Sequence, residues 1–196
     1  PAVGTDAAPL AVIDGEGVRR ILDIVGVDGL VPVPFFLIDL AFESGDADEG
    51  GAMFVDGVTV EIDRCWWSGN TAIRGGAILA QARNLTMLAC RFDGTAAREQ
   101  NKPDDEDWVA VEQQSGGAIH VTDADVVIEA SFFTSNRVYQ GSYPFGDVFG
   151  GAIAAMGTSN LMVTTSRFED NVADASDGDD LPICPDGDAR GGAIYA

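Results

Sequence analysis

The sequence predicts an all-β solenoid, a right-handed parallel β-helix when the family resemblance below is included, with coils of about 25 residues. Two motifs recur along its 196 residues, and the spacing between them varies at one place only. The tetrad Gly-Gly-Ala-Ile, or Gly-Gly-Ala-Met in its first copy, begins at Gly50, Gly75, Gly116, Gly150 and Gly191. An aromatic residue follows 17 or 18 residues after each of the first four tetrads, at Trp67, Phe92, Phe133 and Phe168. The distance from that residue to the next tetrad varies from 8 to 24 residues. A solenoid coil shows this behaviour because it keeps its stacking strands and accepts long insertions at one corner.

Alignment of the copies places similar residues at equivalent positions of successive coils, as expected for side chains that stack about 4.8 Å apart. Four such columns are predicted to face the interior: Phe35, Val60, Leu85, Val126, Leu161; Leu37, Ile62, Met87, Ile128, Val163; Leu40, Cys65, Cys90, Ser131, Ser166; and Phe42, Trp67, Phe92, Phe133, Phe168. Intermediate positions, such as Trp66, Arg91, Phe132 and Arg167, are predicted to face outward in one row. The apolar pattern slips by one residue between Ile62 and Cys65, which predicts a bend and three strands in each coil. The paired glycines predict a tight corner.

The tetrad combined with Phe-x-x-Asn resembles the repeats of chlamydial polymorphic outer membrane proteins, which belong to the pectin-lyase-like group of folds. The second motif occurs at Trp67-x-x-Asn70, Phe133-x-x-Asn136 and Phe168-x-x-Asn171, whereas Phe42 and Phe92 are followed by Gly45 and Thr95. The resemblance implies a right-handed parallel β-helix and an extracellular or cell-surface location. It also implies a structural or adhesive role without catalysis.

The whole chain is predicted to form a single β-helix domain, with N-terminal coils over 1–49 and the repeat coils over 50–196. The last tetrad stands immediately before the end of the sequence and opens a coil that is not completed. An open coil exposes strand edges, so we expect this sequence to be a fragment of a longer chain.

The net charge and the hydropathy of the chain limit the classes of partner that it is expected to bind. The formal net charge of −21 repels phosphate backbones and argues against nucleic acid as a partner. No apolar run reaches the roughly 18 residues needed to cross a bilayer, so this segment is not expected to span a membrane. The partners expected for such a segment are other protein chains of a surface assembly, or glycans.

A carbohydrate-active enzyme is the competing interpretation, because many pectin-lyase-like β-helices cleave polysaccharides. Glu61, Asp63 and Glu129 are scattered and form no acidic column, and His120 is the only histidine. We therefore expect no catalytic residues and no required cofactor. A Ca²⁺-dependent glycan-binding module is the third interpretation.

The insertions concentrate the acidic residues. Asp177, Asp179, Asp186 and Asp188 lie close to glycines in the last insertion, a composition found in oxygen-rich Ca²⁺ loops and, more often, in solvated acidic loops. The insertions also contain aromatic residues that we expect to contact a partner: Trp108, Tyr139, Tyr143, Phe145 and Phe149.

The sequence also contains a candidate disulfide and a candidate glycosylation site. Cys65 and Cys90 occupy one column in adjacent coils, where they form either a disulfide or a pair of buried thiols. Asn84 opens an Asn-Leu-Thr sequon at a turn and is a candidate for N-glycosylation.

Overall fold

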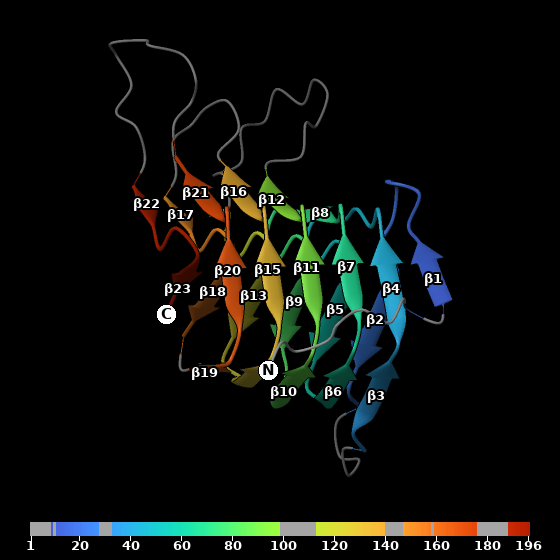
Figure 1. Ribbon diagram of the computed structural model, residues 1–196. Coiled ribbons are helices and arrows are strands. Elements are labelled where there is room, and N and C mark those ends of the chain that lie inside the picture. Colours follow the sequence, from blue (N-terminus) through green and yellow to red (C-terminus); the bar gives the residue numbers. More distant parts are fainter. Residues whose placement is uncertain are drawn as a thin grey trace, which may run out of the picture.

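The computed structural model describes residues 9, 11–27, 33–98, 113–139, 147–157, 159–175 and 188–196. Over these ranges the chain is all-β, and its strands pair in parallel without any helix. Consecutive strands belong to different sheets, and the chain returns to each sheet one coil later, which is the strand order of a solenoid (Figure 1).

Three long sheets carry the stack (Figure 1). Sheet A has the order β1 (Ala11–Asp14), β4 (Leu40–Glu43), β7 (Trp66–Ser68), β11 (Arg91–Asp93), β15 (Phe132–Thr134) and β20 (Arg167–Glu169). Sheet B has the order β2 (Leu22–Val25), β5 (Met53–Asp56), β9 (Ile78–Gln81), β13 (Ile119–Thr122), β18 (Ile153–Met156) and β23 (Ile194–Tyr195). Sheet C has the order β3 (Phe35–Ile38), β6 (Thr59–Asp63), β10 (Asn84–Leu88), β14 (Asp125–Glu129) and β19 (Asn160–Thr164).

Two short sheets lie between sheets A and B in the coil, so the prediction of three strands in each coil was incomplete. Sheet D contains β8 (Thr71–Ala72), β12 (Ala96–Arg98), β16 (Arg137–Tyr139) and β21 (Val172–Asp174), and sheet E contains β17 (Val148–Phe149) and β22 (Ala189–Arg190). In sheet D, Ala97 pairs with Ala72 and Val138, and Val138 pairs with Ala173. Two or three residues give too little alternation for a strand to be recognised from sequence.

The predicted register is confirmed. In sheet C, Val60 pairs with Phe35 and Leu85, and the column continues through Val126 to Leu161. The inner coils bury this column fully, whereas Phe35 at the first coil is 46% exposed. An end coil has only one neighbouring coil in the described part of the chain, so its core positions are only partly covered.

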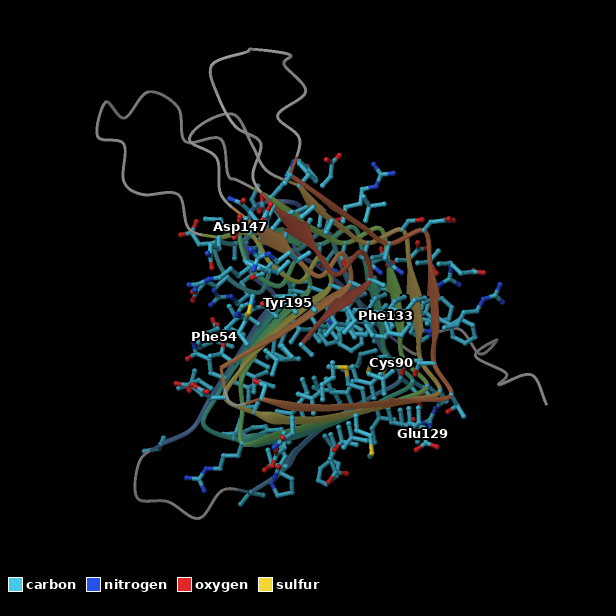
Figure 2. The ribbon with its side chains drawn as sticks, turned by 90° about the vertical axis from the view of Figure 1, so that its left-hand side faces the viewer. Phe54, Cys90, Glu129, Phe133, Asp147 and Tyr195 are labelled. Atoms are coloured by element: carbon cyan, nitrogen blue, oxygen red, sulfur yellow. The ribbon has the colours of Figure 1, made fainter. Side chains whose placement is uncertain are left out.

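The aromatic column forms a continuous ladder inside the stack. Ring centroids are separated by 5.5 Å from Phe42 to Trp67, and by 4.5, 4.7 and 4.7 Å along Trp67, Phe92, Phe133 and Phe168. The last three pairs are parallel within 4°. The first four rings are fully buried. Figure 2, which looks along the stack, shows Phe133 and Cys90 pointing into the interior, whereas Glu129 lies at the outer corner.

Each coil turns at two corners that have different backbone conformations. A Cβ atom on Gly75, which has φ +61°, would lie 2.1 Å from the carbonyl oxygen of Ile78. A Cβ atom on Gly76 would lie 2.2 Å from the carbonyl oxygen of Gly117 in the next coil, so both glycines are sterically required. Between sheets C and A, one left-handed residue in each coil produces the slip in the apolar pattern; these residues are Asp39, Arg64, Ala89, Ala130 and Thr165.

Cys65 and Cys90 are free, buried thiols, so the structure contains the second of the two predicted alternatives and no disulfide between them. The side chains of the column that contains Cys65, Cys90 and Ser131 contact carbonyl oxygens next to the left-handed corner. The thiol of Cys90 lies 3.3 Å from the carbonyl oxygen of Leu88, and the hydroxyl of Ser131 donates to the carbonyl of Glu129 at 2.9 Å. Cysteine and serine therefore act as equivalent donors at this corner.

Candidate functional site

The three long insertions leave the stack from neighbouring strands and return to neighbouring positions. Arg98 pairs with Tyr139, and Tyr139 pairs with Asp174, so the departing ends lie in register in sheet D. On the return side, Ser115 bridges to Arg74 and to Phe149. The prediction that all long insertions leave the coil at one corner is confirmed for the residues at which they begin and end, and we call this line of residues the insertion edge (Figure 1).

The return side of the first insertion contains a buried polar network. Oγ of Ser115 lies 2.7 Å from Nδ1 of His120, and Nε2 of His120 lies 2.9 Å from Oγ1 of Thr122. The Gly116-Gly117 corner causes this contact, because it folds the residue before the tetrad against the outward residue of β13. Sequence reasoning missed Ser115 as the partner of His120, although a serine directly before the tetrad and a histidine four residues after its first glycine were the available signal.

The network has the residue types of a nucleophile and a base, but its environment opposes that use. Burial, together with the positive charge of Arg74, lowers the pKa of His120 to about 4, so the imidazole is neutral at pH 7 and a weak base. Ser115 is only 1% exposed and His120 only 5%. A nucleophile must reach its substrate, so we interpret this network as a structural tie between the insertion and sheet B.

The return side of the later insertions is aromatic and basic. The rings of Phe149 and Tyr195 are 4.7 Å apart, and the guanidinium of Arg190 lies 5.8 Å from the centroid of Phe149. Phe149 is only 5% exposed, so its predicted role as a free contact for a partner is wrong: the ring packs against the stack. Tyr139 is 37% exposed at the root of the second insertion and fits the predicted contact surface.

Most of the predicted loop residues lie outside the described residues: Asp177, Asp179, Asp186, Trp108, Tyr143 and Phe145. Asp188 is described and exposed, and its carboxylate is 2.9 Å from the guanidinium of Arg190. Asp188 and Asp147 raise the pKa of Arg190 through a hydrogen bond and charge attraction. Within the described ranges no three His, Cys, Asp or Glu side chains gather into a group that could hold a metal ion, and Ca²⁺ binding by the last insertion stays a prediction.

Asn84 lies at the start of β10 and is exposed, as is Thr86 of the same sequon. Its side chain is therefore accessible to a modifying enzyme. N-glycosylation of Asn84 stays a prediction that this exposure permits.

The outward face of sheet A carries a second candidate surface, which we call the outer stripe. In its first row, Arg91 pairs with Trp66 and Phe132, and Phe132 pairs with Arg167, so rings and guanidinium groups alternate from coil to coil. The guanidinium carbon of Arg91 lies 5.8 Å from the ring centroid of Trp66, within the range of a cation–π contact.

The second row of the outer stripe follows the same alternation. Asp93 forms an ion pair with Arg91 at 3.1 Å, and Glu169 forms an ion pair with Arg167. The coils with rings instead carry hydroxyls in this row, at Ser68 and Thr134. Each coil of the stripe therefore presents either a ring beside a hydroxyl or a paired cation and anion.

Comparison with known proteins gives no match to a family model, to a curated protein or to a solved structure. The described part of the chain has no helix with the length and apolar character needed to cross a membrane.

Proposed function

We propose that this chain is a right-handed parallel β-helix and a non-catalytic, structural or adhesive segment of a large extracellular or cell-surface protein. Its partners are other protein chains of a surface assembly, or glycans. The observation that carries the proposal is the alignment of the three insertion roots along sheet D and the Gly-Gly corner. Loops that project from one edge of a rigid scaffold commonly carry binding specificity.

The scaffold has the rigidity that this role requires. The aromatic ladder and the buried columns join every coil to the next, so the insertion roots have fixed relative positions. Ser115 and Phe149, at the ends of two insertions, are themselves buried against the stack. A change of sequence inside an insertion therefore need not disturb the coils, which is the property of an adaptable binding edge.

The competing function, carbohydrate cleavage, lacks a supporting arrangement among the described residues. Carboxylates that work as an acid and a base must face the same substrate bond. Asp63 instead pairs with Arg64, and Asp93 pairs with Arg91. Ser115 and His120 are buried, as described above.

The structure suggests a deletion that tests the edge. Coil 67–75 has no insertion and passes from Ala72 through one residue to Arg74, and Arg74 is the bridge partner of Ser115. Removal of residues 99–114, which joins Arg98 to Ser115, recreates that coil length. Removal of 140–148 does the same for the second insertion, and removal of 175–189 for the third. The matched controls keep each insertion's length but replace residues 99–112, 140–146 or 176–187 by glycine and serine.

Each variant is measured by circular dichroism, thermal unfolding, sedimentation velocity for self-association, and retention on immobilised neutral and sialylated glycans. We expect the deletions and the Gly/Ser controls to keep the β spectrum and to weaken self-association or glycan retention relative to the native chain. Unchanged binding after removal of all three insertions would contradict the proposed edge. Loss of the β spectrum in the Gly/Ser controls would contradict the independence of insertions and scaffold.

The location is tested separately. Antibodies raised against the folded chain should label intact, unpermeabilised cells of the source organism, and external protease should remove that labelling. Labelling that requires permeabilised cells would exclude the extracellular or cell-surface location.

A further inference from the structure

The side chains of the outer stripe of sheet A repeat with a period of two coils, and the length of this period can be compared with that of a repeating ligand. Trp66 and Phe132 are both half-buried and stand two strands apart in sheet A. Neighbouring strands of a sheet are about 4.8 Å apart, so these two rings repeat at roughly 9.6 Å along the stack. That length is close to one disaccharide unit of an extended, β-1,4-linked chain of hexoses.

The charged side chains beside the two rings are also suited to bind a chain of hexoses. A hexose presents apolar C–H faces, which pack on aromatic rings, and equatorial hydroxyls, which bond to charged and polar side chains. Along the stripe, the Arg91–Asp93 ion pair lies between the two rings, and the Arg167–Glu169 pair follows Phe132. A sugar chain that runs along the stack would meet a ring at every second coil and a donor–acceptor pair at the coils between.

The charge of the stripe indicates the kind of glycan. The chain as a whole has a formal charge of −21, but in the stripe each arginine is balanced by a carboxylate of its own strand. The acidic protein as a whole repels anionic polymers such as polyuronates, and the stripe itself has no net charge with which to pair a charged sugar. The complementary ligand is therefore uncharged.

We propose that the outer stripe binds a neutral, extended β-linked polysaccharide, with hexose faces on Trp66 and Phe132 and with the chain parallel to the solenoid axis. The proposal rests on the adhesive function above and assigns it a ligand class and a second surface, distinct from the insertion edge. The site needs two rings at once, so affinity should rise steeply when an oligosaccharide becomes long enough to reach both.

The test uses the full chain with cellohexaose, mannohexaose and chitohexaose in calorimetric titrations, with cellobiose, which is too short to cover both rings, for comparison. Trp66→Ala and Phe132→Ala each remove one ring. Phe36→Ala is the matched control, because Phe36 is a 58% exposed ring on sheet C, away from the stripe. The thermal unfolding of all variants is recorded, so that loss of the fold is not mistaken for loss of binding.

We expect at least one of the hexaoses to bind, and each stripe variant to weaken it by about tenfold, which is ~1.4 kcal/mol. Phe36→Ala should leave the affinity unchanged, and cellobiose should bind more weakly than cellohexaose. Absence of binding by all three hexaoses would overturn the proposal. Equal affinities for the native chain and the folded double variant would also overturn it.

Two further arms separate this site from the insertion edge and test the charge argument. Glycan binding that persists in Trp66→Ala/Phe132→Ala but disappears when residues 99–114 are deleted would refute the stripe and support the edge. The double variant Asp93→Asn/Glu169→Gln leaves Arg91 and Arg167 unpaired, so it should gain affinity for polygalacturonate relative to the native chain. A native chain that prefers polygalacturonate to the neutral hexaoses would contradict the assigned ligand class.

Discussion

The side-chain oxygen of Asn136 accepts hydrogen bonds from the backbone N–H of Thr95 at 3.1 Å and from its hydroxyl at 2.7 Å. Thr95 stands where the Phe-x-x-Asn motif lacks its asparagine, one coil earlier. Each asparagine thus serves the coil before its own: Asn70 accepts from the N–H of Gly45 in the same way, at 2.8 Å. A coil without the asparagine still has its turn satisfied from the next coil.

Substitution of Asn136 by Ala should reduce the free energy of unfolding by about 1–3 kcal/mol. It removes the acceptor for the buried N–H of Thr95 and the donor to the carbonyl of Phe92, 3.2 Å away. Asn84→Ala is the control, because Asn84 is exposed. The measurement is urea unfolding followed by circular dichroism, and equal midpoints for both variants would contradict the capping role.

Truncation of one ring of the aromatic ladder should be more costly. Phe133 is fully buried between the rings of Phe92 and Phe168, so Phe133→Ala should lose roughly 3–5 kcal/mol of unfolding free energy. Trp67→Phe is the contrasting variant: Nε1 of Trp67 has no hydrogen-bond partner among the described residues, and its stacking neighbours are phenylalanines. This exchange keeps a ring in the column and removes only part of the indole, so its loss should be smaller than that of Phe133→Ala, at about 1–2 kcal/mol. Similar losses for the two variants in chemical denaturation would argue against the ladder.

Cys65 and Cys90 should react slowly with thiol reagents in the native protein. Burial raises the pKa of the Cys65 thiol to about 11 and that of Cys90 to about 12, so the thiolate is scarce at pH 8. Colorimetric thiol counting should reveal both groups only after denaturation. Cys90→Ser should change stability by less than about 1 kcal/mol, because Ser131 makes the same contact in the next coil. A Cys65–Cys90 cross-link in peptide mass spectra of the non-reduced protein would contradict the free-thiol state.

His120 should make the fold acid-sensitive. Its pKa is about 4 in the folded protein, below the ordinary value of 6.5, so the unfolded chain binds the proton more readily. Stability is therefore unaffected above pH 6.5 and falls as the pH decreases from 6.5 to 4, by ~3 kcal/mol in total. His120→Gln removes this term and is compared with the native chain by urea unfolding at pH 7.0, 5.5 and 4.5. Parallel stability curves for the two proteins would refute this linkage.

Ca²⁺ binding by the last insertion should appear as a stabilisation of the native state. A ligand that binds only the folded chain raises the melting temperature by mass action, so 5 to 10-fold steps of Ca²⁺ up to millimolar concentration should raise it progressively and chelator should reverse the effect. Asp177→Asn/Asp179→Asn should abolish the shift. The control Asp104→Asn/Asp105→Asn removes two charges from the first insertion and should retain it. Identical melting curves with Ca²⁺ and with chelator would leave a solvated acidic loop.

The sequence by itself determined the coil length, the interior columns and the line along which the insertions begin and end. These features repeat, and stacking requires equivalent residues such as Phe92 and Phe133 to meet in the next coil. A repeat therefore converts a one-dimensional spacing into a three-dimensional contact, which is why the register could be predicted without a structure.

Other relationships became visible only in the tertiary structure. Ser115 meets His120 across the Gly-Gly corner, and Phe149, which is buried, lies against Tyr195 of the next coil. Cys65 and Cys90 are free thiols whose sulfur atoms lie near carbonyl oxygens at a left-handed corner. Each of these contacts depends on the angle at which a corner turns the chain. Local sequence constrains that angle weakly, whereas packing of each coil against its neighbours fixes it.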